Sequence, residues 1–300
     1  MEGRAAAAGT TLDLSDFGIM SAMAPKPRSL VLDLFGEYLR FVDAEVRLGP
    51  LTTLLGDFDV APATVRVTMS RLRREGWFTS ERDGRETRYR LTASMLKVLQ
   101  EGRERIFAAP PTSGDGTWTM VIYQLSEGER QERQQLRKDL AWLGFGLLST
   151  STWLAPGDRR EQVRDLVTGL DDKQVEILRC TSDGPEHDRA LAARCWDLAE
   201  LAAEYDGFVA EQAPLLDKAA GLVGPEALVA RTLLISRYRH FPFKDPQLPP
   251  GMRPDPWSGD AAHRLFRDAH RALGPAARAY VGEVIGREVA DVETAPGTPQ

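Results

Sequence analysis

The sequence of 300 residues has only two cysteines, Cys180 and Cys195, and no apolar run near the roughly 20 residues that span a bilayer. Two cysteines are too few for a disulfide framework in a chain of this length. Their spacing around His187 matches no standard zinc pattern and lacks a fourth ligand, so two ordinary buried thiols are favoured over a metal site. The amino-terminal residues have no secretory or transit-peptide character. The sequence therefore predicts a cytoplasmic protein without a membrane segment or a metal.

Recognisable catalytic patterns are missing as well. The sequence contains no Ser-His-Asp or Cys-His arrangement within a known motif, and no glycine-rich loop that could cradle a phosphate. We therefore predict no catalytic residues and no cofactor.

An excess of positive charge is missing from the chain as a whole, because its net charge is −6. This balance argues against indiscriminate nucleic-acid binding. Between Lys26 and Pro110, however, 15 basic side chains face 12 acidic ones, whereas after Pro110 the numbers are 22 and 29. One basic segment on an acidic protein is the distribution expected for localised contact with DNA.

Proline-rich and glycine-rich stretches divide the chain into segments. Pro25-Lys26-Pro27 closes a lead-in of small residues, and the run from Pro110 to Gly116 has the composition of a linker. We expect a disordered extension (1–26), a DNA-binding domain (27–109), a linker (110–116), an α/β domain (117–185), a helical domain (186–288) and a flexible tail (289–300).

The first folded segment has the element order of a winged helix-turn-helix. The apolar spacing and turn residues predict four helices, Ser29–Val42 with Ser29 as N-cap, Pro50–Leu55, Pro62–Glu75 and Ala93–Phe107. Between the last two, Trp77–Glu81 and Thr87–Leu91 flank an Asp-Gly turn and predict a β-hairpin. In such a domain one helix enters the major groove and the hairpin, or wing, reaches the adjacent backbone.

The helix from Pro62 to Glu75 has one apolar and one arginine-bearing face. Val65, Met69 and Leu72 recur at helical spacing and are expected to face the core, while arginines line the other side, where their planar groups could grip guanine or phosphate. The predicted DNA-binding residues are Thr64, Arg66, Ser70, Arg71, Arg73, Arg74, Arg82, Arg85 and Arg88. For any single arginine a solvated helix face is the favoured interpretation, but for the ordered set DNA binding is favoured. Protein contact by the winged helix is the remaining alternative.

The rest of the chain predicts two further folds. Strands over Trp118–Leu125, Phe145–Leu154 and Gln174–Cys180 alternate with helices over Glu127–Leu143 and Asp158–Leu170, which favours a ferredoxin-like α/β sandwich. Helices over Ala190–Glu211, Glu226–Tyr238 and Ala261–Gly286 follow. We therefore predict an α+β multidomain protein with a winged helix-turn-helix, a middle α/β sandwich and a C-terminal helical domain.

Three stretches carry a family resemblance. The first is Ala63-Thr64-Val65-Arg66, with Met69-Ser70-Arg71-Leu72 and Gly76-Trp77-Phe78. The second is Trp196-Asp197-Leu198 with Tyr205 and Phe208, and the third runs from Arg237 through Pro246 to Leu248-Pro249 and Trp257. Together they resemble the PaaX family, repressors of phenylacetate catabolism, from about Arg28 to about Gly286. Ala61 departs from the pattern, because a Ser or Asn cap is usual and stronger before such a helix.

The resemblance implies a homodimer that represses a catabolic operon and binds a two-fold-related double-stranded operator. It also implies release by an effector, an aryl-acetyl coenzyme A thioester. Regulator families keep a fold and change ligands, so another small molecule or a protein partner stays open as the signal.

The third stretch is the candidate effector site. Cationic side chains could meet the phosphates of a thioester and aromatic ones its acyl group, although a structural corner of packed aromatics and paired charges is slightly favoured. The candidate residues are Arg237, Arg239, His240, Phe241, Phe243, Lys244 and Trp257.

An enzymatic role is a further alternative for the middle segment, because its expected fold resembles that of CRISPR-associated spacer-acquisition nucleases. A metal-dependent nuclease needs an acidic residue at the exit of the first strand, which here reads Ile122-Tyr123-Gln124. The next acid, Glu127, fits an ordinary first-turn carboxylate. A nuclease is therefore the least favoured function.

Overall fold

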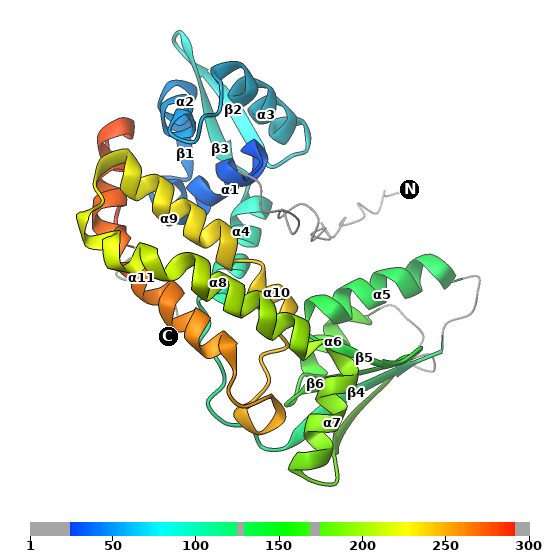
Figure 1. Cartoon of the computed structure of the whole chain (residues 1–300). Helices are drawn as coiled ribbons and strands as arrows, with labels where there is room; N and C mark the ends of the chain where they lie inside the picture. The colour runs from blue at the N-terminus through cyan, green and yellow to red at the C-terminus, as the bar shows by residue number, and fades with distance from the viewer. Residues whose placement is uncertain (1–24, 125–128, 169–174, 292–300) are drawn as a thin grey trace, which may run out of the picture. The chain divides into compact units, whose positions relative to one another are not determined.

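The structure, a computed structural model, describes residues 25–124, 129–168 and 175–291 (Figure 1). It is a mixed α+β protein with two small antiparallel sheets and many helices. The described chain divides into two compact units that do not follow chain order. The first unit takes in the chain up to Glu101, Gly221–Ser236 and the residues from Leu273 onward, and the second takes in Gly102–Ala220 and Arg237–Ala272. Each helix in the described ranges is too short or too polar to qualify as a membrane span.

The first unit opens with short helices and a three-stranded sheet. Its elements up to Phe107 are α1 (Pro27–Glu37), the 3-10 helix η2 (Leu39–Phe41), β1 (Glu45–Arg47), α2 (Leu48–Gly56), α3 (Pro62–Arg74), β2 (Phe78–Asp83), β3 (Glu86–Leu91) and α4 (Ala93–Phe107). The predicted second and third helices are found within two residues of their expected ends, and α4 has the predicted ends, although its last residues belong to the second unit.

The prediction for the first helix was wrong at both ends. The helix begins at Pro27 rather than after Ser29, because proline at the first helical position needs no N–H partner. It ends at Glu37, since Tyr38 leaves the helical region with φ −134° and ψ −59°. A 3-10 turn then covers the rest of the expected range.

The sheet of the first unit has the strand order β1-β3-β2, all antiparallel. The predicted hairpin is confirmed, and its register pairs Asp83 with Glu86 across a two-residue loop. Gly84 adopts φ +63° at the first loop position, a conformation that favours glycine. The third strand, β1, was not predicted, because three residues give too short a pattern to recognise.

The core of the first unit includes residues far apart in the sequence. The α1 side chains Leu30, Leu34 and Phe35 are buried in the same cluster as Ala227 and Leu228 of α9 (Gly224–Tyr238), and Ala277 and Val281 of α11 (Ser258–Ile285). An apolar helix that is covered on several sides buries its polar residues too. Glu37 accordingly forms an ion pair of 3.3 Å with Arg231, with side chains only 3% and 2% exposed. The expected helical segment 186–288 thus contributes to both units.

The second unit is built around a four-stranded antiparallel sheet with the order β5-β6-β4-β7. Its strands are β4 (Thr117–Tyr123), β5 (Gly146–Ser149), β6 (Thr152–Pro156) and β7 (Val175–Thr181). Two helices, α5 (Arg130–Trp142) and α6 (Arg160–Leu166), pack on one face through Leu136, Leu140 and Val163. Part of the opposite face is covered at Trp118, which donates a hydrogen bond of 2.6 Å to Asp188.

Two elements that were predicted as continuous are each divided into two in the structure of this unit. The expected strand Phe145–Leu154 is the antiparallel pair β5 and β6, with Ser149 opposite Thr152 across a tight turn. The expected helix Ala190–Glu211 is α7 (Pro185–Cys195) followed by α8 (Leu198–Lys218). The break between α7 and α8 has a clear cause. The Asp197 side chain accepts a hydrogen bond of 2.9 Å from the Glu200 N–H and caps α8. The remaining short helices are η4 (Ala219–Gly221), α10 (Phe241–Lys244) and η5 (Pro250–Met252).

Candidate nucleic-acid interface

Helix α3 packs on the core through the three residues that helical spacing predicted. Val65, Met69 and Leu72 are buried, with at most 1% of each exposed, so this part of the prediction is confirmed. No side chain caps the helix at Ala61, and Pro62 occupies its first turn. The packing leaves the opposite side of α3 to solvent.

The carboxyl end of α3 is fixed by a glycine. Gly76 adopts φ +79°, and the N–H of Trp77 donates to the carbonyl oxygen of Leu72 at 3.0 Å. This is the Schellman arrangement, in which a left-handed residue reverses the chain and satisfies a terminal carbonyl. Because β2 begins two residues later, the same turn sets the position of the hairpin next to α3.

The exposed side of α3 carries arginines without acidic partners. Arg66, Arg73 and Arg74 are exposed, and none forms an ion pair with any described residue. Arg71 differs, because its Nε donates to Glu75 at 2.8 Å, and Glu75 also pairs with Arg28 at 3.0 Å. Thr64 and Ser70, the predicted polar residues of this face, are exposed as well. Arginine stays protonated at any physiological pH, so three positive charges on this face have no internal counter-charge.

The wing adds two more such arginines. Arg82 and Arg85 are exposed near the tip of the hairpin, with no ion pair among the residues that the structure describes. Arg88 is placed differently, since it and Arg90 bind the two carboxylate oxygens of Glu45 on β1, at 3.0 and 2.5 Å. Arg88 therefore differs from Arg82 and Arg85, because a carboxylate already balances its charge.

Sequence reasoning missed Val67 on the same face. This side chain is 68% exposed, the largest exposed fraction of any large apolar residue among those described. The sequence contained a signal for this exposure, because Val67 does not share the helical spacing of the buried residues Val65, Met69 and Leu72. An exposed apolar group among arginines can contact the methyl group of thymine.

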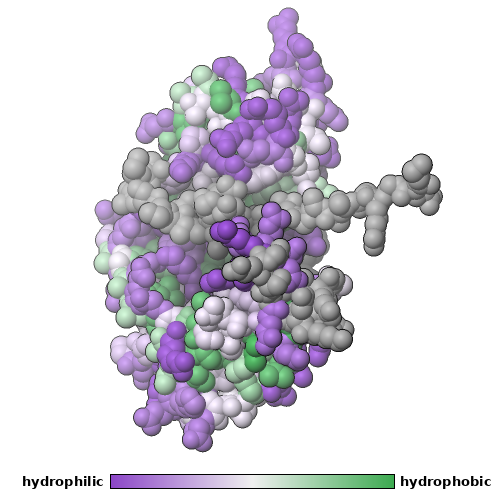
Figure 2. Space-filling model, turned by 90° about the vertical axis from the view of Figure 1, so that its right-hand side faces the viewer, coloured by the Kyte–Doolittle hydropathy of each residue, from purple (hydrophilic) through white to green (hydrophobic). Residues whose placement is uncertain are grey.

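The hydrophilic character of this part of the first unit is visible on the surface. Figure 2 looks at the side on which α3 lies in Figure 1, and hydrophilic residues gather on the projecting hairpin and beside it, next to a smaller hydrophobic area. A cluster of unpaired positive charge on a chain of net charge −6 creates a local field that attracts polyanions. The arrangement can bind a nucleic-acid backbone and present side chains to a groove.

The predicted effector residues lie in a packed corner of the second unit. Phe241 and Trp257 are buried against Tyr205, with ring centroids 4.1 and 5.9 Å away. The Tyr205 hydroxyl donates to Asp245 at 2.8 Å, and burial raises the pKa of both groups. Phe243 stacks on Trp142 at 4.8 Å.

The cationic members of this set have acidic neighbours or are buried. Lys244 binds Glu204 at 2.7 Å, and Arg237 binds Glu211 at 3.3 Å. Arg239 is 5% exposed. Burial, aided by the charge of Lys244, lowers the pKa of His240 to about 4, so this histidine is neutral at pH 7.

An open groove of about 810 Å³ lies elsewhere in the second unit, where α7 gives way to α8. Leu198 and Met252 contribute buried apolar surface, and Arg189 and Arg194 are exposed along it. This volume lies within the range of small-molecule sites.

Metal-ligating side chains do not gather in the described ranges, where no group of three His, Cys, Asp or Glu residues could hold an ion. Glu127, the acid considered for a nuclease, lies outside the described residues. Both cysteines are free thiols, and burial raises the pKa of Cys195 to about 11.

Comparison with known proteins places these features in one family. Residues 26–95 match the model of a PaaX-like protein, 111–192 that of the PaaX protein central Cas2-like domain, and 196–283 that of the PaaX-like protein C-terminal domain. The chain is 31% identical over 290 residues to the transcriptional repressor PaaX of Escherichia coli (strain K12), covering 93% of this chain and 90% of that protein.

One solved structure has a similar fold. The uncharacterized protein Rv0674 from Mycobacterium tuberculosis aligns with 85% of this chain and 98% of its own, with a TM-score of 0.56 and 24% identity. The family matches together span nearly the whole described chain, and the identity to the curated relative extends over the same length. The chain therefore belongs to the PaaX family.

Proposed function

We propose that this protein is a transcriptional repressor, and not an enzyme, that binds a double-stranded DNA operator through a winged helix-turn-helix. In this domain α3 is the recognition helix and the β2–β3 hairpin is the wing. The observation that carries the proposal is the set of exposed arginines without acidic partners, Arg66, Arg73 and Arg74 on α3 and Arg82 and Arg85 on the wing. The repressor name of the E. coli relative supports the same function.

The protein acts as a cytoplasmic homodimer. A winged helix that reads half of a two-fold operator needs a second copy for the other half. The β5-β6-β4-β7 order, with α5 and α6 on one face, is the order of a ferredoxin-like sandwich and supports a separate module that can pair two subunits. Light scattering behind a sizing column measures the oligomeric state directly.

Release from the operator follows the binding of an aryl-acetyl coenzyme A thioester by the second unit. The family resemblance supports this effector class. The groove beside α7 and α8 supports the presence of room for a small molecule in this unit.

Operator binding is tested with DNA from the protein's own promoter region and fluorescence anisotropy. Arg66→Ala and Arg73→Ala should each weaken binding about tenfold to a hundredfold, since each removes a charged contact to base or phosphate. Arg164→Ala is the matched control, because Arg164 is an exposed arginine on α6 without an ion pair in the described chain. Unchanged binding in both α3 variants, with the dimer intact, would refute the recognition helix.

The effector is tested by titrating phenylacetyl-coenzyme A into the protein–operator complex. Release by the thioester, with no release by coenzyme A alone, supports the proposal. Release by neither compound means that another small molecule or a protein partner is the signal.

A further inference from the structure

Two arginines of the second unit hold a positive charge in a partly buried position. Arg105, near the end of α4, donates its Nε to the carbonyl oxygen of Pro242 at 2.7 Å and its Nη1 to the carbonyl oxygen of Trp142. Its guanidinium also lies 5.1 and 4.9 Å from the ring centroids of Trp142 and Phe243. Four contacts to neutral groups thus orient this side chain, but none of them neutralises its charge.

Arg159 meets the same helix end. Its Nη1 lies 3.5 Å from the carbonyl oxygen of Leu143, the residue after Trp142, and its Nε lies 3.4 Å from that of Pro156. The two guanidinium groups are close enough that the charge of Arg159 lowers the pKa of Arg105, which burial and this charge together bring to about 10. Burial also lowers the pKa of Arg159.

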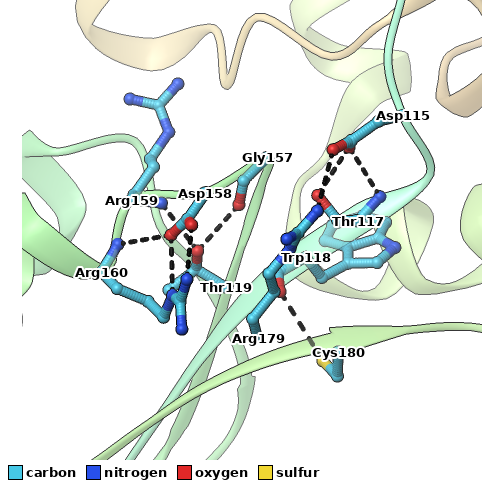
Figure 3. A network of polar contacts seen from close by, with 10 residues as sticks. All are labelled: Asp115, Thr117, Trp118, Thr119, Gly157, Asp158, Arg159, Arg160, Arg179 and Cys180. Atoms are coloured by element: carbon cyan, nitrogen blue, oxygen red, sulfur yellow. Dashed lines mark hydrogen bonds and ion pairs between the residues drawn. The ribbon is translucent and has the colours of Figure 1, made fainter.

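The neighbouring Arg160 shows what an internally balanced arginine looks like. Its Nε and Nη2 donate to the two carboxylate oxygens of Asp158 at 2.9 and 2.7 Å. Figure 3 shows the Arg160 side chain turned toward Asp158 and the Arg159 side chain extended in another direction, away from that carboxylate. The main chain of Arg159 is held firmly, because its N–H donates to the Thr119 hydroxyl at 2.8 Å.

The charges at this position do not balance. Neither Arg105 nor Arg159 has an acidic partner among the described residues. The end of α5 contributes roughly half a negative charge through its last carbonyls, against two full positive charges. Each guanidinium has five N–H donors, and the Nη2 group of each has no partner within the described chain. Two adjacent partly buried cations with free donors are costly unless an anion joins them.

We propose that Arg105 and Arg159 together bind an oxyanion group, a phosphate or carboxylate, carried by the small-molecule effector. Planar guanidinium groups bind such anions through paired N–H donors. A small molecule fits better than a DNA backbone, because both side chains are half-buried and the exposed arginines of α3 and the wing are the accessible ones. Of the effector residues predicted from the sequence, Phe243 belongs to this site, because its ring contacts Arg105.

The assignment of this anion to the effector rests on the proposed function, so the first experiment uses a simpler probe. Calorimetric titration of the full-length protein with inorganic pyrophosphate measures the anion site alone. Arg159→Gln should weaken pyrophosphate binding at least about tenfold, because a charge-assisted hydrogen bond is lost, and Arg160→Gln should change it less than about twofold. Melting temperatures check that each variant is folded.

The second experiment measures operator release by phenylacetyl-coenzyme A. Arg159→Gln should raise the concentration needed for release at least about tenfold, while Arg160→Gln leaves it unchanged. Arg194→Gln tests the open groove as a rival position, since Arg194 lines it.

Each outcome decides the inference. Selective loss of pyrophosphate binding in Arg159→Gln supports the site, even where the thioester fails to release the wild type and the proposed effector is thereby rejected. Three results overturn the site: no pyrophosphate binding by the wild type at millimolar concentration, equal losses in Arg159→Gln and Arg160→Gln, or a release defect in Arg194→Gln that Arg159→Gln does not share.

Discussion

The exposed face of α3 and the corner from Arg237 to Trp257 are both rich in cationic side chains, yet the structure treats them in opposite ways. On α3, Arg66 and Arg73 extend into solvent and have no acidic partner among the described residues. In the corner, Lys244 and Arg237 bind glutamates.

The difference lies in the partners and not in the residue types. A positive charge that a carboxylate already balances has little left to attract a ligand, whereas an unbalanced one on the surface attracts polyanions over a distance of about 10 Å in salt. The same criterion separates Arg159 from Arg160 and Arg85 from Arg88. We therefore propose that ion pairing distinguishes binding arginines from structural ones more sharply than composition does.

The largest difference between the two regions should be in how much an apolar side chain contributes to the free energy of unfolding. Phe241 is 1% exposed in the corner, so Phe241→Ala should lower the free energy of unfolding by about 3–5 kcal/mol. Val67 is 68% exposed on α3, so Val67→Ala should change it by less than about 0.5 kcal/mol. Urea unfolding measures both values.

Operator affinity should show the reverse order. Val67→Ala should weaken binding several-fold, and Phe241→Ala should leave it unchanged once the folded fraction is taken into account. An equal loss of stability in both variants would mean that the two regions do not differ as described.

A smaller difference should appear in the pH dependence of the free energy of unfolding, to which His240 of the corner contributes. Burial lowers the pKa of His240 to about 4 from its ordinary value of 6.5, so the unfolded chain binds a proton more readily between these values. The contribution of His240 to stability is therefore fully present above pH 6.5 and is lost as the pH falls toward 4. With the side chain 27% exposed, the loss should be about 2 kcal/mol.

The measurement compares urea unfolding of the wild type and His240→Gln from pH 7 to pH 4. Other groups that face His240, Glu204 and Lys244 among them, are present in both proteins. The variant should lose about 2 kcal/mol less over this range. Parallel curves for the two proteins would show that His240 takes up its proton as easily in the folded corner as in the unfolded chain.

The parts of the fold that could be predicted are those set by local pattern. Val65, Met69 and Leu72 lie within one helix, and the hairpin follows from its turn residues, so neither needs information from distant sequence. The same local information was present but overlooked at Asp197, where a capping residue with Glu three positions later separates α7 from α8.

The parts that could not be predicted depend on pairing across long distances. Arg231 meets Glu37 after almost two hundred intervening residues, and nothing near either one announces the other. The same holds for Glu45, which binds Arg88 through a strand too short to recognise. Because the sequence shows residue types and not partners, it could list the arginines of the candidate site but not sort them.

The smallest difference should be in operator affinity between two arginines of the wing. Arg85 has no ion pair in the described chain, whereas Arg88 binds Glu45. Arg85→Ala should weaken operator binding about fivefold to tenfold and reduce the slope of log affinity against log salt by about one, since one phosphate contact is lost. Arg88→Ala should change both quantities less, because its charge is already balanced. Anisotropy titrations at several salt concentrations give both slopes. A larger loss in Arg88→Ala than in Arg85→Ala would show that the pair with Glu45 opens on DNA, and pairing would then no longer separate binding arginines from structural ones.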